Sequence, residues 1–244
     1  MGDVEIEKNL ISQRCSPTDE ILGSMKSFVD AVENQTLKHF LTVILCSGAR
    51  ASEALNGYVY YDDNNELTFS CLVLKKKRLT KWSMNKHRKF LGKDHLKALL
   101  QMDIWKDRTM INPFNLDVGW LNDNASFDLS DPNWLFDEKE IVKYSTMYRE
   151  LKKVSKMNVR YNPNLYGWKK SRVVTFNPAP HFFRKAFCSE LIRSGKMNAF
   201  NLTHYLNWEK MDTGLSYVRG YGNIEDKKML DLITKDKFNR KGIR

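Results

Sequence analysis

Cysteine is scarce in this sequence, and its spacing excludes two classes of protein. Only four occur among 244 residues, and no CxxC pair is present. A disulfide framework or a zinc site would need cysteines at closer, repeated spacing. Cys46, Cys71 and Cys188 lie in apolar stretches, whereas Cys15 precedes a helix start. We therefore expect reduced, buried thiols and no metal.

Long hydrophobic runs are absent as well. The longest, from Phe40 to Cys46, is far shorter than the ~20 residues that cross a bilayer as a helix. The acidic start MGDVE is unlike a signal peptide. Ile6 occupies the position where myristoylation requires Ser or Thr. We expect an intracellular protein with no membrane partner.

Acidic residues are outnumbered by basic ones. The chain has 29 Asp and Glu against 40 Lys and Arg, which gives a net charge of +11. So basic a protein favours a polyanionic partner, first nucleic acid and second an anionic membrane surface. The alternative is a soluble basic protein without such a partner. A hydrophobic content of 42% indicates a folded chain.

The order of elements predicts a mainly helical α+β domain with a small antiparallel sheet near its N-terminal side. After a lead-in segment, residues 1–15, a single domain is expected over 16–244, with an irregular insertion near 103–136. Residues 158–180 are also predicted to be irregular. Strands are expected at 58–61, 67–74 and somewhere within 79–91. Apolar periodicity and caps predict helices at 16–32, 37–47, 51–56, 94–101, 136–156, 181–194, 197–206, 213–219 and 224–238.

Arg50 is the first candidate site residue. It directly follows the apolar helix that Gly48 ends, so its side chain is placed by a rigid element. Glu53, three residues on, can reach back and orient the guanidinium. A guanidinium matches the oxygens of a phosphate with two parallel N–H groups. The alternative is an ordinary surface ion pair.

His181 and Arg184 form a second candidate pair, one helical turn apart. A proton acceptor beside a cation suits phosphoryl transfer. The pair opens a helix after Pro178-Ala179-Pro180, which exposes the first turn. By itself, HxxR also occurs in any basic amphipathic helix.

Trp208 and Tyr217 complete the candidate site. The indole N–H is a donor only, so it can bind a phosphate oxygen without exchanging protons. A phenol can act as a nucleophile once a neighbouring group accepts its proton. Tyr205 and Tyr221 are rival nucleophiles, and Tyr217 is preferred because it lies nine residues after Trp208. A lone Trp is more often a packed core residue.

An early Arg in SGARASEAL, then HxxR, then Trp nine residues before Tyr resembles the tyrosine site-specific recombinases, the integrase family. The resemblance covers roughly residues 16–236 and corresponds to the catalytic domain of that family. The sequence departs from the family pattern in three ways. We expect the separate N-terminal DNA-binding domain that many members carry to be missing. The stretch before HxxR is longer than usual, and Asn207 stands where Gly often precedes the His or Trp.

The resemblance implies a catalytic lysine on a β-hairpin. Lys75 is the first choice and Lys77 the second, because alternation places both on one face. Lys86 is held in reserve. The alternative is a solvated basic tract that contacts the DNA backbone, and DNA-binding roles are expected for Lys76, Arg78 and Lys185.

The resemblance further implies DNA cleavage through a 3′-phosphotyrosyl intermediate, with neither metal nor nucleotide cofactor. It implies a homotetramer on two double-stranded DNA sites, with or without an accessory DNA-binding protein, and a C-terminal helix, 224–238, exchanged between subunits. A virus or mobile element is the expected source. Two alternatives remain open: a type IB topoisomerase-like activity and a noncatalytic DNA-binding descendant.

Overall fold

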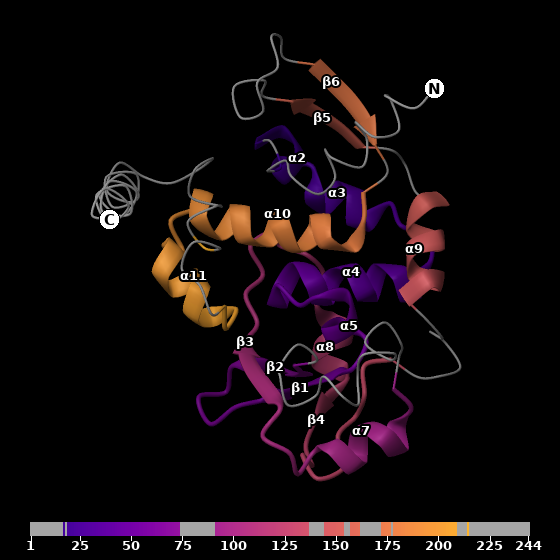
Figure 1. Ribbon diagram of the computed structural model, residues 1–244, viewed down its shortest axis with the longest axis vertical. Helices are drawn as coiled ribbons and strands as arrows, with labels where there is room; N and C mark the ends of the chain where they lie inside the picture. Colours follow the sequence, from indigo (N-terminus) through magenta and orange to yellow (C-terminus); the bar gives the residue numbers. More distant parts are fainter. Residues whose placement is uncertain are drawn as a thin grey trace, which may run out of the picture.

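The computed structural model describes residue 17 and residues 19–73, 91–136, 144–153, 157–161, 172–176, 178–208 and 214. For 157–161 and 172–176 only the backbone is described. These segments form a layered arrangement of helices between two sheets (Figure 1). The predicted class, mainly helical α+β with a small sheet early in the chain, is confirmed.

The helices match most of the predicted ones. The first predicted helix is divided in two at Ser24, and Asn34 caps the third because its side chain accepts a 2.9 Å hydrogen bond from the Leu37 N–H. The helices are α2 (Asp19–Gly23), α3 (Met25–Asp30), α4 (Gln35–Ser47), α5 (Ala51–Ala54), α7 (Lys93–Leu99), α8 (Gly119–Asp123), α9 (Tyr144–Lys153), α10 (Pro180–Arg193) and α11 (Ala199–Tyr205).

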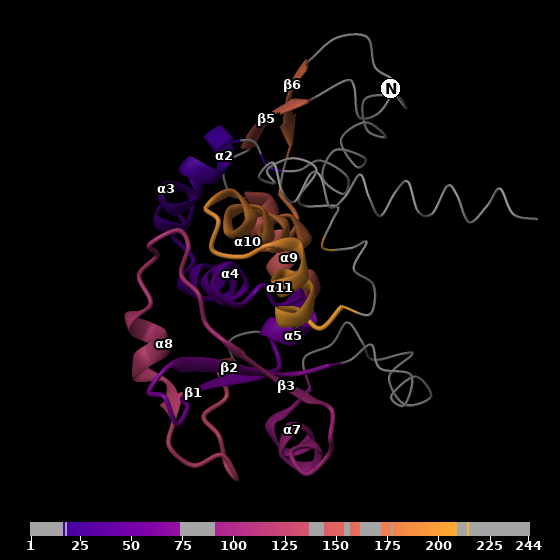
Figure 2. The same cartoon turned by 90° about the vertical axis from the view of Figure 1, so that its left-hand side faces the viewer.

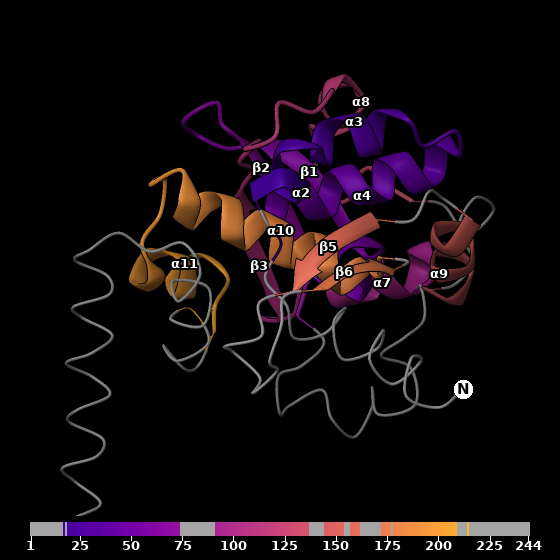
Figure 3. The same ribbon diagram turned by 90° about the horizontal axis from the view of Figure 1, so that it is seen from above.

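The larger sheet has the strand order β3-β2-β1-β4. Neighbours β1 and β2, and β2 and β3, pair antiparallel, whereas the short β4 runs parallel to β1. A smaller antiparallel sheet, β5 with β6, lies at the opposite end of the molecule (Figures 1 and 2). Figure 3, seen from above, shows this smaller sheet in front of α10. The strands are β1 (Gly57–Tyr61), β2 (Leu67–Leu72), β3 (Trp105–Thr109), β4 (Ala125–Ser126), β5 (Met157–Tyr161) and β6 (Arg172–Phe176).

Two stretches predicted to be irregular contain regular structure. The segment near 103–136 holds β3, α8 and β4, and the segment 158–180 holds most of β5 and all of β6. The prediction of irregular chain there was wrong. β3 and β4 take their hydrogen bonds from β2 and β1, far earlier in the chain, whereas β5 and β6 pair with each other. Most of the third predicted strand, within 79–91, and the predicted helices at 213–219 (except Gly214) and 224–238 lie outside the described residues.

The main core lies where α4 packs against α10 and the sheet (Figure 2). Phe40, Ile44 and Phe183 are fully buried there. Cys46, Cys71 and Cys188 are buried free thiols, as predicted, and burial raises the pKa of the first two to about 12. Cys15 lies outside the described residues. Among the helices that the structure describes, none is long and apolar enough to span a bilayer.

Candidate functional site

A close contact between two helices sets the position of Arg50. Gly48 ends α4 in the left-handed conformation, with φ 62°. A Cβ on Gly48 would lie 2.7 Å from the Phe187 ring and 2.9 Å from Leu206. Only glycine fits this backbone and this approach, so the chain can turn against α10. Arg50, two residues later, becomes the N-cap residue of α5.

Glu53 holds Arg50 by two contacts from the first turn of α5. Its Oε2 accepts a 2.8 Å hydrogen bond from the Arg50 backbone N–H, and its Oε1 lies 2.5 Å from Arg50 Nη1. The Glu53 side chain is 2% exposed, whereas that of Arg50 is 31% exposed. The predicted contact between the two residues is therefore present, and part of the Arg50 side chain is exposed to solvent.

Two further arginines approach the same carboxylate. Arg108 Nη1, on β3, donates to Glu53 Oε2 at 3.3 Å. Arg184 Nη1, on α10, lies 3.5 Å from the same oxygen and also donates to the carbonyl of Gly48. The side chains of Arg108 and Arg184 are both 2% exposed. The structure thus gathers three guanidinium groups, from three elements, around one buried carboxylate; we call these four residues the Glu53 cluster.

The cluster carries an excess of positive charge. Burial alone raises the pKa of Glu53, but the charges of Arg108, Arg184 and Arg50 and the Arg50 N–H outweigh burial and lower that pKa to about 2. Glu53 is therefore ionised at neutral pH. Burial lowers the pKa of Arg184, although Glu53 opposes that change. Because arginine stays protonated in proteins, three positive charges face one negative charge.

Two donor groups in the cluster are buried and unsatisfied. Within the described part of the chain, Arg184 Nη2 and Arg108 Nε are buried and have no hydrogen-bond partner. An unsatisfied buried donor is costly, and in native proteins it often indicates a functional site. The partly exposed side chain of Arg50 is the member of the cluster chemically suited to bind the oxygens of a phosphate.

Trp208 contacts Arg184, and His181 lies on the same helix as Arg184. The Arg184 guanidinium carbon lies 5.6 Å from the centroid of the Trp208 ring, a cation–π distance, and Trp208 is half-buried. His181 is exposed in the first turn of α10, where Pro180 occupies the start of the helix. Lys185 is partly exposed on the same helix. The structure therefore brings Arg50, Arg184 and Trp208 together.

Five of the predicted site residues lie outside the described part of the chain. They are the nucleophile and the basic tract: Tyr217, Lys75, Lys76, Lys77 and Arg78. The rival nucleophile Tyr221 and the reserve lysine Lys86 lie outside it as well. The chemical roles of all these residues stay predictions.

The other rival nucleophile, Tyr205, is held in a structural contact. Its hydroxyl donates a 2.7 Å hydrogen bond to the carbonyl of Thr109. Burial raises the pKa of Tyr205 well above the ordinary phenol value. A phenol that is difficult to ionise and already engaged with the backbone is a poor nucleophile. The geometry therefore disfavours Tyr205.

Arg108 is the member of the cluster that the sequence did not reveal. It follows Trp105, Lys106 and Asp107 in a segment rich in charged residues. Nothing in that pattern distinguishes a buried arginine from a solvated one. Arg108 is identified by the pairing of β3 with β2, which only the tertiary structure provides.

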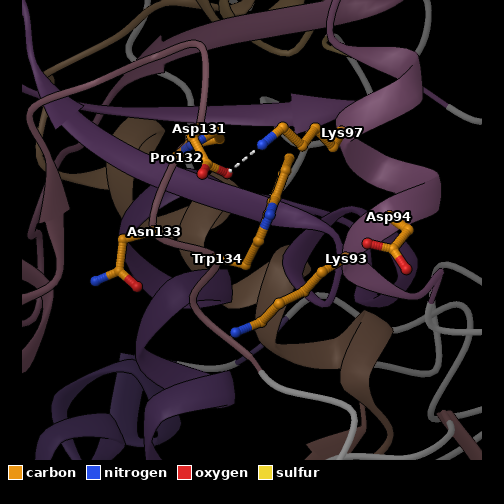
Figure 4. Close-up of a pocket in the computed structure, with 7 residues that line it drawn as sticks. All are labelled: Lys93, Asp94, Lys97, Asp131, Pro132, Asn133 and Trp134. Atoms are coloured by element: carbon orange, nitrogen blue, oxygen red, sulfur yellow. Dashed lines mark ion pairs between the residues drawn. The ribbon is translucent and has the colours of Figure 1, made fainter.

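A separate pocket lies beside α7 and shares no residue with the Glu53 cluster. Figure 4 shows Trp134 within it, with Lys97 directed towards Asp131 at an Nζ–Oδ1 distance of 3.2 Å. Its volume is about 480 Å³, and two lysines and two aspartates balance its charge. Among the described residues, no group of three or more His, Cys, Asp or Glu side chains is arranged to hold a metal.

Comparison with protein-family models and with curated proteins finds no match. Among solved structures, the chain is similar to the XerH site-specific recombinase bound to difH substrate in a pre-cleavage complex. The TM-score is 0.45 with 14% sequence identity, and the match covers 82% of this chain and 49% of that one. For the XerH post-cleavage complex with palindromic difH substrate, the TM-score is 0.44 with 16% sequence identity. That match covers 91% of this chain and 52% of the recombinase chain. The chain spans about half the length of these recombinase chains.

Proposed function

We propose that the protein is a tyrosine recombinase that breaks and rejoins DNA through a 3′-phosphotyrosyl intermediate. The observation that carries the proposal is the Glu53 cluster. Two of its arginines, Arg50 and Arg184, were selected from the sequence as phosphate-binding residues. Both form ion pairs with the Glu53 carboxylate. An excess of positive charge beside a partly exposed arginine suits a DNA phosphodiester.

In the proposed reaction, Tyr217 Oη attacks the phosphorus and the bond to the 5′ oxygen breaks. The 3′ phosphate becomes linked to tyrosine, and a 5′-hydroxyl is released. Arg50 and Arg184 stabilise the charge of the five-coordinate phosphorus. His181 accepts the phenol proton, directly or through a relay, and Lys75 protonates the leaving oxygen. Attack by a 5′-hydroxyl of the second DNA strand reverses the step.

Trp208 is assigned to phosphate positioning. Its ring lies against the Arg184 guanidinium, so it limits the orientations that Arg184 can adopt. Its indole N–H is a donor that suits a non-bridging phosphate oxygen. Lys76, Arg78 and Lys185 are proposed to contact the DNA backbone without sequence preference.

Assembly belongs to the same proposal. Recombination joins two DNA sites, so we propose a homotetramer, with or without an accessory DNA-binding protein. Residues 224–238 are proposed as a helix exchanged between subunits. Removing the chain from Gly222 onward and measuring synapsis by gel mobility tests this role: normal synapsis by the truncated protein would contradict it.

Covalent trapping tests the chemistry. The protein is incubated with DNA from around its own gene and denatured in SDS, and wild type is compared with Tyr217→Phe. We expect an adduct with wild type that is lost in Tyr217→Phe and retained in the matched variants Tyr205→Phe and Tyr221→Phe. No adduct on any DNA, with binding intact, would favour a noncatalytic DNA-binding protein. An adduct that survives Tyr217→Phe would move the nucleophile to another tyrosine.

A topoisomerase is distinguished by its product. Relaxation of supercoiled DNA without sequence preference and without strand exchange would replace the recombinase proposal with a type IB topoisomerase-like activity. Exchange of strands between two labelled duplexes supports recombination.

A further inference from the structure

Arg108 reaches the Glu53 cluster from a strand that belongs to the segment 103–136. In β3 it pairs with Phe69 of β2, and the two side chains lie on the same face of the sheet because directly opposed residues do so. Phe69 is fully buried, so Arg108 points into the core from the edge of the sheet. A buried guanidinium needs a compensating charge, and Glu53 supplies it.

The position of Arg108 is fixed from several directions. The Ile111 N–H donates to the carbonyl of Cys46, at 2.8 Å, which ties the end of β3 to α4. Tyr205 of α11 donates to the carbonyl of Thr109, the residue after Arg108. Both contacts lie just after Arg108 in the chain and hold this end of the strand, and with it Arg108, in register with the cluster.

The two carboxylate oxygens of Glu53 have different side-chain partners. Oε1 lies 2.5 Å from Arg50 Nη1, whereas Oε2 accepts from Arg108 Nη1 at 3.3 Å and lies 3.5 Å from Arg184 Nη1. Oε2 also accepts the 2.8 Å hydrogen bond from the Arg50 backbone N–H. Arg184 Nη1 also donates to Gly48, so of the two arginines at Oε2 it is Arg108 that makes the side-chain hydrogen bond to the carboxylate. A carboxylate held at Oε2 presents Oε1 in one orientation.

We propose that Arg108 is a positioning residue for Arg50: it fixes the Glu53 carboxylate, which in turn aims the Arg50 guanidinium at the DNA phosphate. The proposal rests on the proposed function. It also assigns a role to the 103–136 segment, which supplies an arginine to the site in addition to those that the sequence motifs select.

The charges around Glu53 support this role. The groups facing it are Arg50 beside it in α5, Arg108 from β3, Arg184 from α10 and the neutral thiol of Cys71 from β2. Against the effect of burial, which raises the pKa of Glu53, Arg108 is the largest of the opposing charges. Loss of that charge raises the pKa of Glu53, so the carboxylate is protonated at higher pH.

The test compares wild type, Arg108→Met, Arg108→Lys and the control Lys106→Met on the same strand. DNA affinity and the rate of covalent adduct formation at saturating DNA are measured between pH 4.5 and 8. We expect Arg108→Met to form the adduct about 10²-fold more slowly, as for a misplaced catalytic group, with its DNA Kd unchanged within about threefold. The acid limb of its pH–rate profile, where the adduct rate falls on acidification, is expected at higher pH than that of wild type. Arg108→Lys keeps the charge, so the acid limb of its profile is expected to stay at low pH.

A purely structural role for Arg108 predicts lower thermal stability with an unchanged rate and acid limb in the folded fraction, and that result would overturn the proposal. If Arg108→Met does not fold, Arg108→Lys decides. An adduct rate at least tenfold below wild type with intact DNA binding supports positioning, and a wild-type rate contradicts it. Absence of an adduct with wild type itself would overturn the proposed function, and this inference with it.

Discussion

Arg184 Nη1 lies 3.5 Å from Glu53 Oε2, and both side chains are 2% exposed. The same nitrogen donates to the carbonyl of Gly48, 136 residues earlier in the chain. One guanidinium therefore joins α10 to the junction between α4 and α5. Because the ion pair is buried, breaking it by removing one partner is far more costly than breaking a surface pair.

The pH dependence of folding is expected to follow Glu53. Its pKa is lowered from 4.5 to about 2 in the folded protein, so on acidification the unfolded chain takes up the proton first. Glu53 thus contributes stability above pH ~4.5, about 3 kcal/mol, which is lost as the pH falls towards ~2. In urea unfolding followed by tryptophan fluorescence, the free energy of unfolding is expected to fall less on acidification for Glu53→Gln than for wild type.

Glu66→Gln is the matched control for this measurement, because Glu66 is exposed in the turn before β2. It is expected to keep the wild-type profile. Parallel profiles for wild type and Glu53→Gln would contradict the ionised, buried state of Glu53.

Gly48→Ala is expected to destabilise the fold by about 2 kcal/mol or more, because the new Cβ meets Phe187 and Leu206 at a positive φ. Gly23→Ala is the control: it ends α2, and a Cβ there has nothing within 4 Å. That change is expected to be neutral or stabilising by up to about 1 kcal/mol. Chemical denaturation of both variants measures the difference, and equal free energies of unfolding would contradict it.

Tyr205→Phe is expected to lower stability by about 1 kcal/mol, since it removes the hydroxyl that donates to the carbonyl of Thr109. The covalent adduct with DNA is expected to persist, because Tyr205 is not the proposed nucleophile. Thermal denaturation and the SDS trapping assay check both statements. Loss of the adduct in a folded Tyr205→Phe protein would reverse the assignment.

Arg50→Lys is expected to slow adduct formation by about 10² to 10³, as for loss of one charge-stabilising donor, while DNA affinity changes little. An ammonium cannot pair with Glu53 and at the same time present a second pair of donors to phosphate. Single-turnover rates at saturating DNA make the comparison. Lys26→Met is the control, because Lys26 pairs only with exposed Asp30 among the described contacts. A wild-type rate for Arg50→Lys would exclude Arg50 from the chemistry.

Local features of the sequence anticipated several parts of this molecule. Apolar spacing located α4, α7 and α10, and the residues around Gly48 marked the end of α4. The spacing of Arg50 and Glu53 predicted their contact, because residues three apart in a first helical turn face one another. These features depend on neighbours in the chain, so the sequence by itself determined them.

The composition of the Glu53 cluster was decided by the tertiary structure. Arg108 joins it only because β3 pairs with β2, and Arg184 only because α10 packs against the end of α4. Strand pairing and helix packing are set by long-range hydrogen bonds and burial, which leave no fixed spacing in the sequence. The sequence therefore selected residues able to bind phosphate, whereas the fold decided which arginines share one carboxylate.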